Sequence, residues 1–172
     1  MSASATLIAS LGLGENFLAH YRPPPQNEAA EHELQPIAYA DTLKPILATA
    51  TTTTCWKKMS SAAAQDGISL HVISGFRSIE YQFDIIQRKL NAGQDMNQIL
   101  EISALPGFSE HHTGRALDLG QTGTPPLTEE FEQTNAFNWL QSHAREFSFS
   151  MSYPRGNQHG IAFEPWHWLC SP

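Results

Sequence analysis

The spacing of hydrophobic and polar positions predicts a helix over residues 41–65, followed by a short buried strand at residues 70–73. Asp41 is a suitable N-cap for this helix, and Gly67 is a suitable stop because glycine adopts the backbone conformation that ends helices. The four threonines at 51–54 argue against the helix, since β-branched side chains lose rotamer freedom there.

The rest of the chain predicts further helices and then mostly antiparallel strands, which is typical of a single α+β domain with a small sheet flanked by helices. Ser78 can cap the second helix, and Thr134 can act as a cap inside a later helical region. In chain order these elements are helices at 78–90 (closed by residues 91–93) and 95–104, a strand at 115–119, a helical region at 128–146, and strands at 147–152 and 161–169, separated by a turn at 154–157.

The N-terminal region predicts an extension at residues 1–39 that precedes the main domain at residues 40–172. Residues 21–36 are rich in proline and polar side chains, which favours an extended lead-in on the surface. The apolar run at 5–13 has no basic residues before it and is interrupted by Gly12, so it resembles neither a signal peptide nor a membrane span. Either the protein is cytoplasmic, or its export signal is absent from this chain.

Composition narrows the class of partner. Hydrophobic residues make up 41% of the 172 residues and charged residues 16%, which indicates a globular chain. The net charge of -7 argues against nucleic-acid binding, which needs a basic face, and leaves small molecules and peptides. Cys55 and Cys170 lack metal-site spacing; we expect two free thiols, with a single disulfide as the alternative.

Two segments combine metal-ligand residues with a carboxylate. In the segment 109–118, His111 and Asp118 are separated by Gly114, which lets the chain reverse, and Ala116 leaves space on the face that Asp118 shares. Nitrogen and oxygen ligands at such a corner suit zinc.

Near the C-terminus, Glu164 and His167 would point to opposite faces of a regular strand, but Pro165 disrupts the strand and can turn both toward one cavity. Together, His111, Asp118 and His167 supply three ligands, and Glu164 supplies a base.

A third segment, Ser74-Gly-Phe-Arg-Ser78, places Arg77 in a loop between a strand and a helix. Arg77 can stabilise an oxyanion or bind a substrate carboxylate, although a structural ion pair is an alternative.

His159 competes with the proposed ligands, and we expect it beside the ligands or the substrate. The other histidines are expected to be ordinary surface or core residues, namely His20, His32, His71, His112 and His143. The tryptophans are expected in the core or in a pocket wall, namely Trp56, Trp139, Trp166 and Trp168.

Taken together, the three segments resemble the VanY-type D-alanyl-D-alanine carboxypeptidases, a group of zinc peptidases that includes L,D-carboxypeptidases and VanX-like dipeptidases. The family pattern Ser-x-His-x-x-Gly-x-Ala-x-Asp is met at residues 109–118, and the tail Glu-Pro-Trp-His is met at 164–167. The pattern Ser-Gly-aromatic-Arg-Ser, with a glutamine four residues later, is met at 74–78 and Gln82. The resemblance covers about residues 40–169.

This resemblance implies one zinc ion per chain and a peptidoglycan stem peptide as substrate. It implies that His111, Asp118 and His167 bind zinc, that Glu164 is the general base and that Arg77 stabilises the oxyanion. It implies substrate contacts for Gln82, Ser109, Ser152 and Tyr153. The family's exported members usually carry a signal or lipoprotein segment, and this chain shows none.

Several functions share these motifs. The main prediction is a D-Ala-D-Ala carboxypeptidase, and the alternatives are an L,D-carboxypeptidase acting on tetrapeptide stems, a VanX-like D,D-dipeptidase and a phage-type endopeptidase. A peptidoglycan-binding module without activity is the non-enzyme alternative. A purely structural zinc site is disfavoured, because such sites prefer cysteine and close all four positions.

Overall fold

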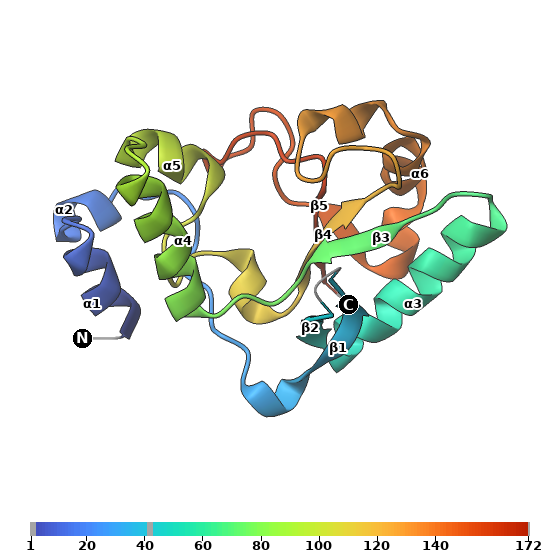
Figure 1. Ribbon diagram of the computed structural model, residues 1–172, viewed down its shortest axis with the longest axis horizontal. Coiled ribbons are helices and arrows are strands. Elements are labelled where there is room, and N and C mark those ends of the chain that lie inside the picture. The colour runs from blue at the N-terminus through green and yellow to red at the C-terminus, as the bar shows by residue number, and fades with distance from the viewer. Residues whose placement is uncertain (1–2, 41–42, 172) are drawn as a thin grey trace.

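The computed structural model describes residues 3–40 and 43–171 and contains two antiparallel sheets (Figure 1). The strands are β1 (Leu34–Tyr39), β2 (Pro45–Thr49), β3 (His71–Ser74), β4 (Ala116–Gly120), β5 (Phe149–Met151) and β6 (His167–Cys170). The larger sheet has the order β3-β4-β6-β5, and β1 pairs with β2 in the smaller one. The predicted α+β class, with a small antiparallel sheet and flanking helices, is confirmed.

The helices form two groups, one packed on the larger sheet and one set apart from it (Figure 1). The α-helices are α1 (Ala3–Ser10), α2 (Glu15–Leu18), α3 (Ala50–Gln65), α4 (Ile79–Asn91), α5 (Met96–Ile102) and α6 (Asn135–His143). The short 3-10 helices are η1 (Glu31–Glu33), η2 (Glu110–Thr113), η3 (Glu129–Gln133) and η4 (Ala144–Phe147). The sheet with α3 and α6 forms one end of the molecule, and α1, α2, α4 and α5 form the other. None of the described helices is long and apolar enough to cross a membrane.

The alternation of side chains along β4 gives the larger sheet two different faces. Leu117 and Leu119 are fully buried in the core that includes residues of α3 and α6. Ala116 and Asp118 lie on the opposite face, which is turned away from this core. The main hydrophobic core therefore holds β4 in place while its other face is free to carry polar side chains.

A second hydrophobic cluster holds the separate helices together. Ile8 of α1 packs with Ile86 of α4 and Ile99 of α5, and each of the three is at most 1% exposed. The proline-rich segment that follows is tied to the region before β4, since Gln26 N–H donates to Gly107 O and Ala29 N–H donates to the carbonyl of His112. The division of the chain at residues 39 and 40 stays a prediction, but residues before it contribute to this cluster.

Four of the predicted elements agree closely with the structure. Ser78 caps α4 by accepting a hydrogen bond from Tyr81 N–H, and Thr134 caps α6 in the same way through Phe137 N–H. The predicted strand at 70–73 is β3, and the predicted short helix at 95–104 is α5. These elements carry their own local signals, namely capping side chains and regular hydrophobic spacing.

The helix predicted from residue 41 was wrong in its first part. Residues 45–49 form β2, and Thr49 instead caps α3 by accepting from Thr52 N–H. Asp41, the predicted cap, lies outside the described residues. The threonine run is accommodated because Thr53 and Thr54 hydroxyls donate to backbone carbonyls four residues earlier.

The strand predicted over 161–169 was also wrong in its first part, since regular pairing begins only at His167. Pro165 cannot donate to a sheet, and the chain turns there instead. Cys55 and Cys170 are free thiols that contact one another, and burial together with Cys55 raises the pKa of Cys170 to about 12.

Candidate active site

Asp118 and His167 are held side by side by the pairing of two strands. They are directly opposite residues in the antiparallel register of β4 and β6. His167 Nδ1 lies 3.2 Å from Asp118 Oδ1, and both side chains are almost completely buried. Since opposite residues on one face of such a pair have neighbouring Cβ atoms, the sheet register alone brings these two groups together.

His111 reaches the same point from the short helix η2. Gly114 ends η2 with a positive φ of 64°, and a Cβ there would lie 2.9 Å from Leu34 Cδ2, so the tight reversal into β4 requires glycine. His111 Nε2 then lies 3.3 Å from Asp118 Oδ2, while its Nδ1 is 2.7 Å from the carbonyl of Gly75. This hydrogen bond assigns the proton to Nδ1 and leaves Nε2 with a lone pair directed at the site.

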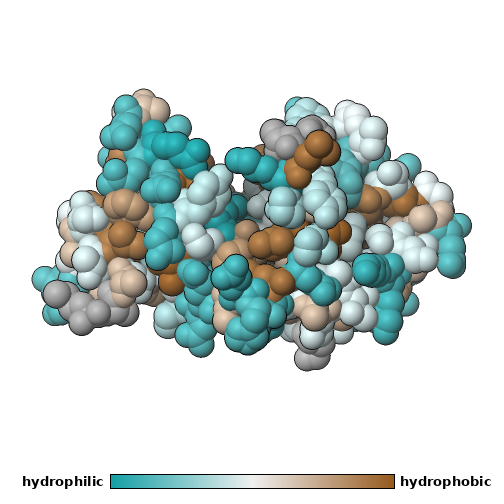
Figure 2. All heavy atoms as spheres, turned by 60° about the horizontal axis from the view of Figure 1, so that its bottom comes forward, coloured by the Kyte–Doolittle hydropathy of each residue, from teal (hydrophilic) through white to brown (hydrophobic). Residues whose placement is uncertain are grey.

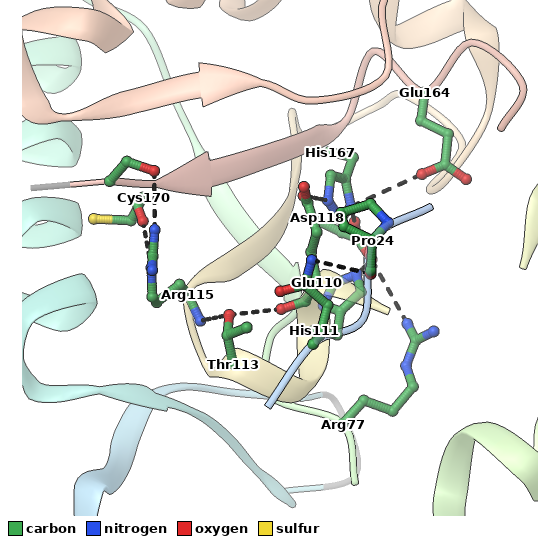
Figure 3. Close-up of polar contacts among 12 residues, drawn as sticks. Pro24, Arg77, Glu110, His111, Thr113, Arg115, Asp118, Glu164, His167 and Cys170 are labelled. Carbon is green, nitrogen blue, oxygen red and sulfur yellow. Dashed lines mark hydrogen bonds and ion pairs between the residues drawn. The ribbon is translucent and has the colours of Figure 1, made fainter. Parts of the chain in front are cut away.

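Glu164 shares the cavity with His167 because the chain makes a turn between them. His167 N–H donates to the carbonyl of Glu164, with Pro165 and Trp166 forming the corner of the turn. The carboxylate of Glu164 lies 3.8 Å from His167 Nδ1 and points toward it in the close-up (Figure 3). Pro165 therefore has the effect expected from the sequence.

One nitrogen from each of His111 and His167 and one oxygen of Asp118 lie within 4.8 Å of one another, as metal ligands do. Burial alone would raise the pKa of Asp118, but His111 and His167 hold it well below its usual range. Burial lowers the pKa of His167, but its bonds to two carboxylates outweigh this effect and raise the pKa to about 10. The surroundings of His167 thus favour a positive charge at this point.

Glu110 is a second carboxylate on His167 and was not predicted from the sequence. Its Oε2 lies 2.9 Å from His167 Nε2, and the residue is 9% exposed. Burial tends to raise its pKa, but the hydrogen bond with His167 and a further one with Ser152 lower it. Its place directly before His111 was the available signal. With its Nε2 bonded to Glu110, His167 turns its Nδ1 toward Asp118. Carboxylates orient metal-binding histidines in this way.

Arg77 lies beside Asp118 and is held in place by a residue of α4. Its Nη2 is 3.9 Å from Asp118 Oδ2, and its Nη1 donates to Gln82 Oε1 at 2.9 Å. Gln82, which is fully buried on α4, donates in turn to the carbonyl of Ala104. Because both ends of the Gln82 amide have protein partners, this residue holds the Arg77 guanidinium in place.

One cavity of about 400 Å³, between the sheet and the separate helices, is lined by Arg77, Gln82, His111, Asp118, Glu164 and His167. The space-filling view shows an indentation between the two ends of the molecule (Figure 2). Of the predicted substrate contacts, Gln82, Ser109 and Tyr153 line this cavity, whereas Ser152 is not among its lining residues and forms a hydrogen bond with Glu110. Burial and the nearby carboxylates raise the pKa of Tyr153, so its hydroxyl stays protonated. Trp166 also lines the cavity, and the other three tryptophans pack in or against the main core.

The remaining histidines lie outside this group. His112 is fully buried, but its ring bonds to the carbonyl of Arg77 and to Gly107 N–H. His159 faces a different cavity and contacts Tyr153 edge-on, with ring centroids 6.0 Å apart. Three more are exposed, namely His20, His32 and His71. His143 Nδ1 lies at hydrogen-bond distance, 3.0 Å, from Glu146 Oε1.

The chain belongs to the VanY D-alanyl-D-alanine carboxypeptidase family, whose family model matches residues 46–172. The Bacillus subtilis protein YodJ, which is named as a carboxypeptidase, is 34% identical over 115 residues, covering 64% of this chain and 41% of that protein. The chain spans about two fifths of the length of the curated relatives it matches first.

Solved structures with the same fold include two carboxypeptidases. The L,D-carboxypeptidase LdcB is 28% identical with a TM-score of 0.73, covering 86% of this chain and 71% of LdcB. A D,D-pentapeptidase VanY from a VanB-type resistance cassette, solved with Zn(II), is 23% identical with a TM-score of 0.64, covering 88% of each chain. The latter likeness shows the fold alone.

Proposed function

We propose that this chain is a zinc-dependent D-alanyl-D-alanine carboxypeptidase that removes the terminal D-alanine from peptidoglycan stem peptides. The observation that carries the proposal is the convergence of His111, Asp118 and His167 on one cavity, with Glu164 beside them. A metal-ligand group and a free carboxylate in one cavity are the parts that a metal-dependent peptidase needs.

The three ligand residues fit a single zinc ion per chain. Two imidazole nitrogens and one carboxylate oxygen form a ligand set that zinc accepts, and catalytic zinc sites commonly use three protein ligands and keep one position open. When bound, zinc would polarise the scissile carbonyl and lower the pKa of a water molecule. The Zn(II) found in the related VanY structure is consistent with this choice of metal.

Glu164 has the properties of a proton carrier. Burial raises its pKa to about 7, although His167, Arg77 and Lys89 act in the opposite direction. A carboxyl group that titrates near neutral pH can take a proton from the attacking water and then give it to the leaving amine. Arg77, whose guanidinium lines the cavity, is proposed to stabilise the negative charge that develops on the carbonyl oxygen.

An L,D-carboxypeptidase is the second candidate, because LdcB has this activity and shares the fold with a TM-score of 0.73. The test is to incubate the zinc-loaded protein with a pentapeptide stem, a tetrapeptide stem and the free dipeptide D-Ala-D-Ala, and to weigh the products by mass spectrometry. We expect loss of one alanine from the pentapeptide. Cleavage of the tetrapeptide alone would establish the L,D-activity, and cleavage of the dipeptide alone would establish a dipeptidase. No cleavage by a protein that contains zinc would support a binding module.

A further inference from the structure

Lys89 brings a second positive charge into the active-site cavity. Gln82, Ile85 and Lys89 lie three and four residues apart on α4 and all line the cavity that contains the predicted metal ligands. The ammonium group of Lys89 donates to the hydroxyl of Ser103 at 2.7 Å, and the side chain is partly buried. The sequence motif at residues 74–78, which contains Arg77, did not indicate that Lys89 would line the same cavity.

The surroundings of Lys89 do not neutralise its charge. Among the residues that the structure describes, no carboxylate forms an ion pair with Lys89, and its bonded partner Ser103 is neutral. Burial and the positive charge of Arg77 lower the pKa of Lys89, while the carboxylate of Glu164 raises it. Arg77 and Glu164 therefore both lie close enough to interact electrostatically with Lys89. A partly buried cation without a protein counter-ion is costly unless an anion from outside binds to it.

The position of Lys89 suits an anion that enters with the substrate. In a carboxypeptidase substrate the terminal carboxylate belongs to the residue directly after the scissile bond, and neighbouring Cα atoms are about 3.8 Å apart. The carboxylate must therefore bind close to Glu164 and the metal ligands. Arg77, 3.9 Å from Asp118, lies at the reaction centre itself. Lys89 lies near the C-terminal end of α4 and lines the same cavity.

We propose that the ammonium group of Lys89 binds the terminal carboxylate of the substrate and makes this site select peptides with a free C-terminus. The inference rests on the proposed peptidase function of the same cavity. A hydrogen bond between an ammonium and a carboxylate is stronger than one between neutral groups, so losing it weakens substrate binding by about tenfold or more. A peptide with an amidated C-terminus has no charge to lose and is affected little.

The experiment compares a stem pentapeptide with a free C-terminus and the same peptide with a C-terminal amide. The zinc-loaded wild type is expected to prefer the free carboxylate, and Lys89→Met is expected to lower kcat/KM for that peptide at least tenfold, mainly through KM. Activity on the amide should change by less than about threefold, whereas Lys89→Arg should keep most of the preference because it keeps the charge. Lys57→Met, at an exposed position on α3, is the matched control and should behave as wild type.

Ser103→Ala separates charge from packing. This variant removes the tie between Lys89 and Ser103 but leaves the ammonium, so it should keep the preference for the free carboxylate. Equal losses on both peptides in Lys89→Met and Ser103→Ala would show a purely structural tie and overturn the inference. An unchanged preference in a folded, zinc-loaded Lys89→Met would overturn it as well.

Binding of the two peptides, measured by calorimetry in the Glu164→Gln background, tests the inference without hydrolysis. If the wild type cleaved neither peptide, the proposed function would fail. A tenfold weaker binding of the free-carboxylate peptide in Lys89→Met would still support the role of Lys89, and equal binding would reject it.

Discussion

The turn that carries His111 has two faces, and its neighbouring histidines show how differently buried imidazoles are used. His111 faces the cavity and is 4% exposed, while His112 faces the other way and is fully buried. His112 Nδ1 is bonded to the carbonyl of Arg77 and its Nε2 to Gly107 N–H, so both ring nitrogens have neutral backbone partners. His111 has one backbone partner, and its second nitrogen faces the carboxylate of Asp118.

This difference shows that burial does not by itself identify a metal ligand. A buried histidine whose two nitrogens both bond to the backbone has a complete set of partners and serves the structure. On the cavity face, the two carboxylates Asp118 and Glu110 surround His167, with a third, Glu164, 3.8 Å away (Figure 3). Such a concentration of acceptors and negative charge attracts a cation, and this is the feature that separates the two faces.

Removing the proposed zinc ion should have the largest effect. A chelator is expected to abolish peptide hydrolysis and lower the melting temperature, because a ligand present at 1,000 times its Kd stabilises the fold by about 4 kcal/mol. His111→Ala should lose both metal and activity, whereas His112→Asn should retain bound zinc, as measured by atomic emission. Equal zinc contents in the two variants would contradict the distinction between the two faces.

Glu164→Gln should have the next largest effect and act on the reaction alone. The amide keeps the shape of the side chain but cannot accept and return a proton, so kcat should fall by about 10²- to 10⁴-fold. Zinc content should stay at the wild-type level, because Glu164 is not one of the three proposed ligand residues. Near-normal turnover in this variant would show that another group is the base.

Much of the site could be predicted because its signals are local. Pro165 lies between Glu164 and His167, and Gly114 lies between His111 and Asp118, so the two reversals are visible in the sequence. The hydrogen bond between Glu110 and His167 joins residues 57 positions apart, so the place of Glu110 beside His111 in the sequence does not reveal its partner.

A non-local contact also explains why residues 45–49 do not belong to the helix that was predicted over residues 41–65. That segment is a strand because it pairs with β1, a non-local contact that overrides the helical spacing of its side chains.

Buried His112 should make the stability of the fold depend on pH. Burial lowers the pKa of His112 to about 4, below the ordinary value of 6.5 that the unfolded chain restores. Because the unfolded state binds the proton more readily between these values, stability is fully present above pH 6.5 and is lost as the pH falls toward 4. The full difference corresponds to about 3 kcal/mol.

Urea unfolding of chelator-treated protein between pH 7 and pH 4 measures this loss. His112→Asn should show a smaller decrease in unfolding free energy than wild type over that range. His71→Asn, which changes an exposed histidine, should match wild type. If all three proteins lost stability in parallel, the pH dependence would come from groups other than His112.

The smallest predicted effect concerns how the two histidines of the proposed zinc site are oriented. His111 is held by a backbone carbonyl, which no substitution removes, but His167 is held by the carboxylate of Glu110. Replacing such a carboxylate typically weakens metal binding by about 10- to 100-fold. Glu110→Ala should therefore weaken zinc binding by this amount in a competition titration with a chromophoric chelator.

Glu110→Gln makes the test specific. Its amide oxygen can still accept the Nε2–H of His167 but carries no charge, so its zinc affinity should lie between those of wild type and Glu110→Ala. Ser152→Ala, which removes a hydrogen bond to Glu110 but keeps the Glu110 carboxylate, should have the weakest effect of the three. If all three variants bound zinc as wild type does, His167 would be held by the sheet register alone, and the carboxylate behind it would serve the fold as the partners of His112 do.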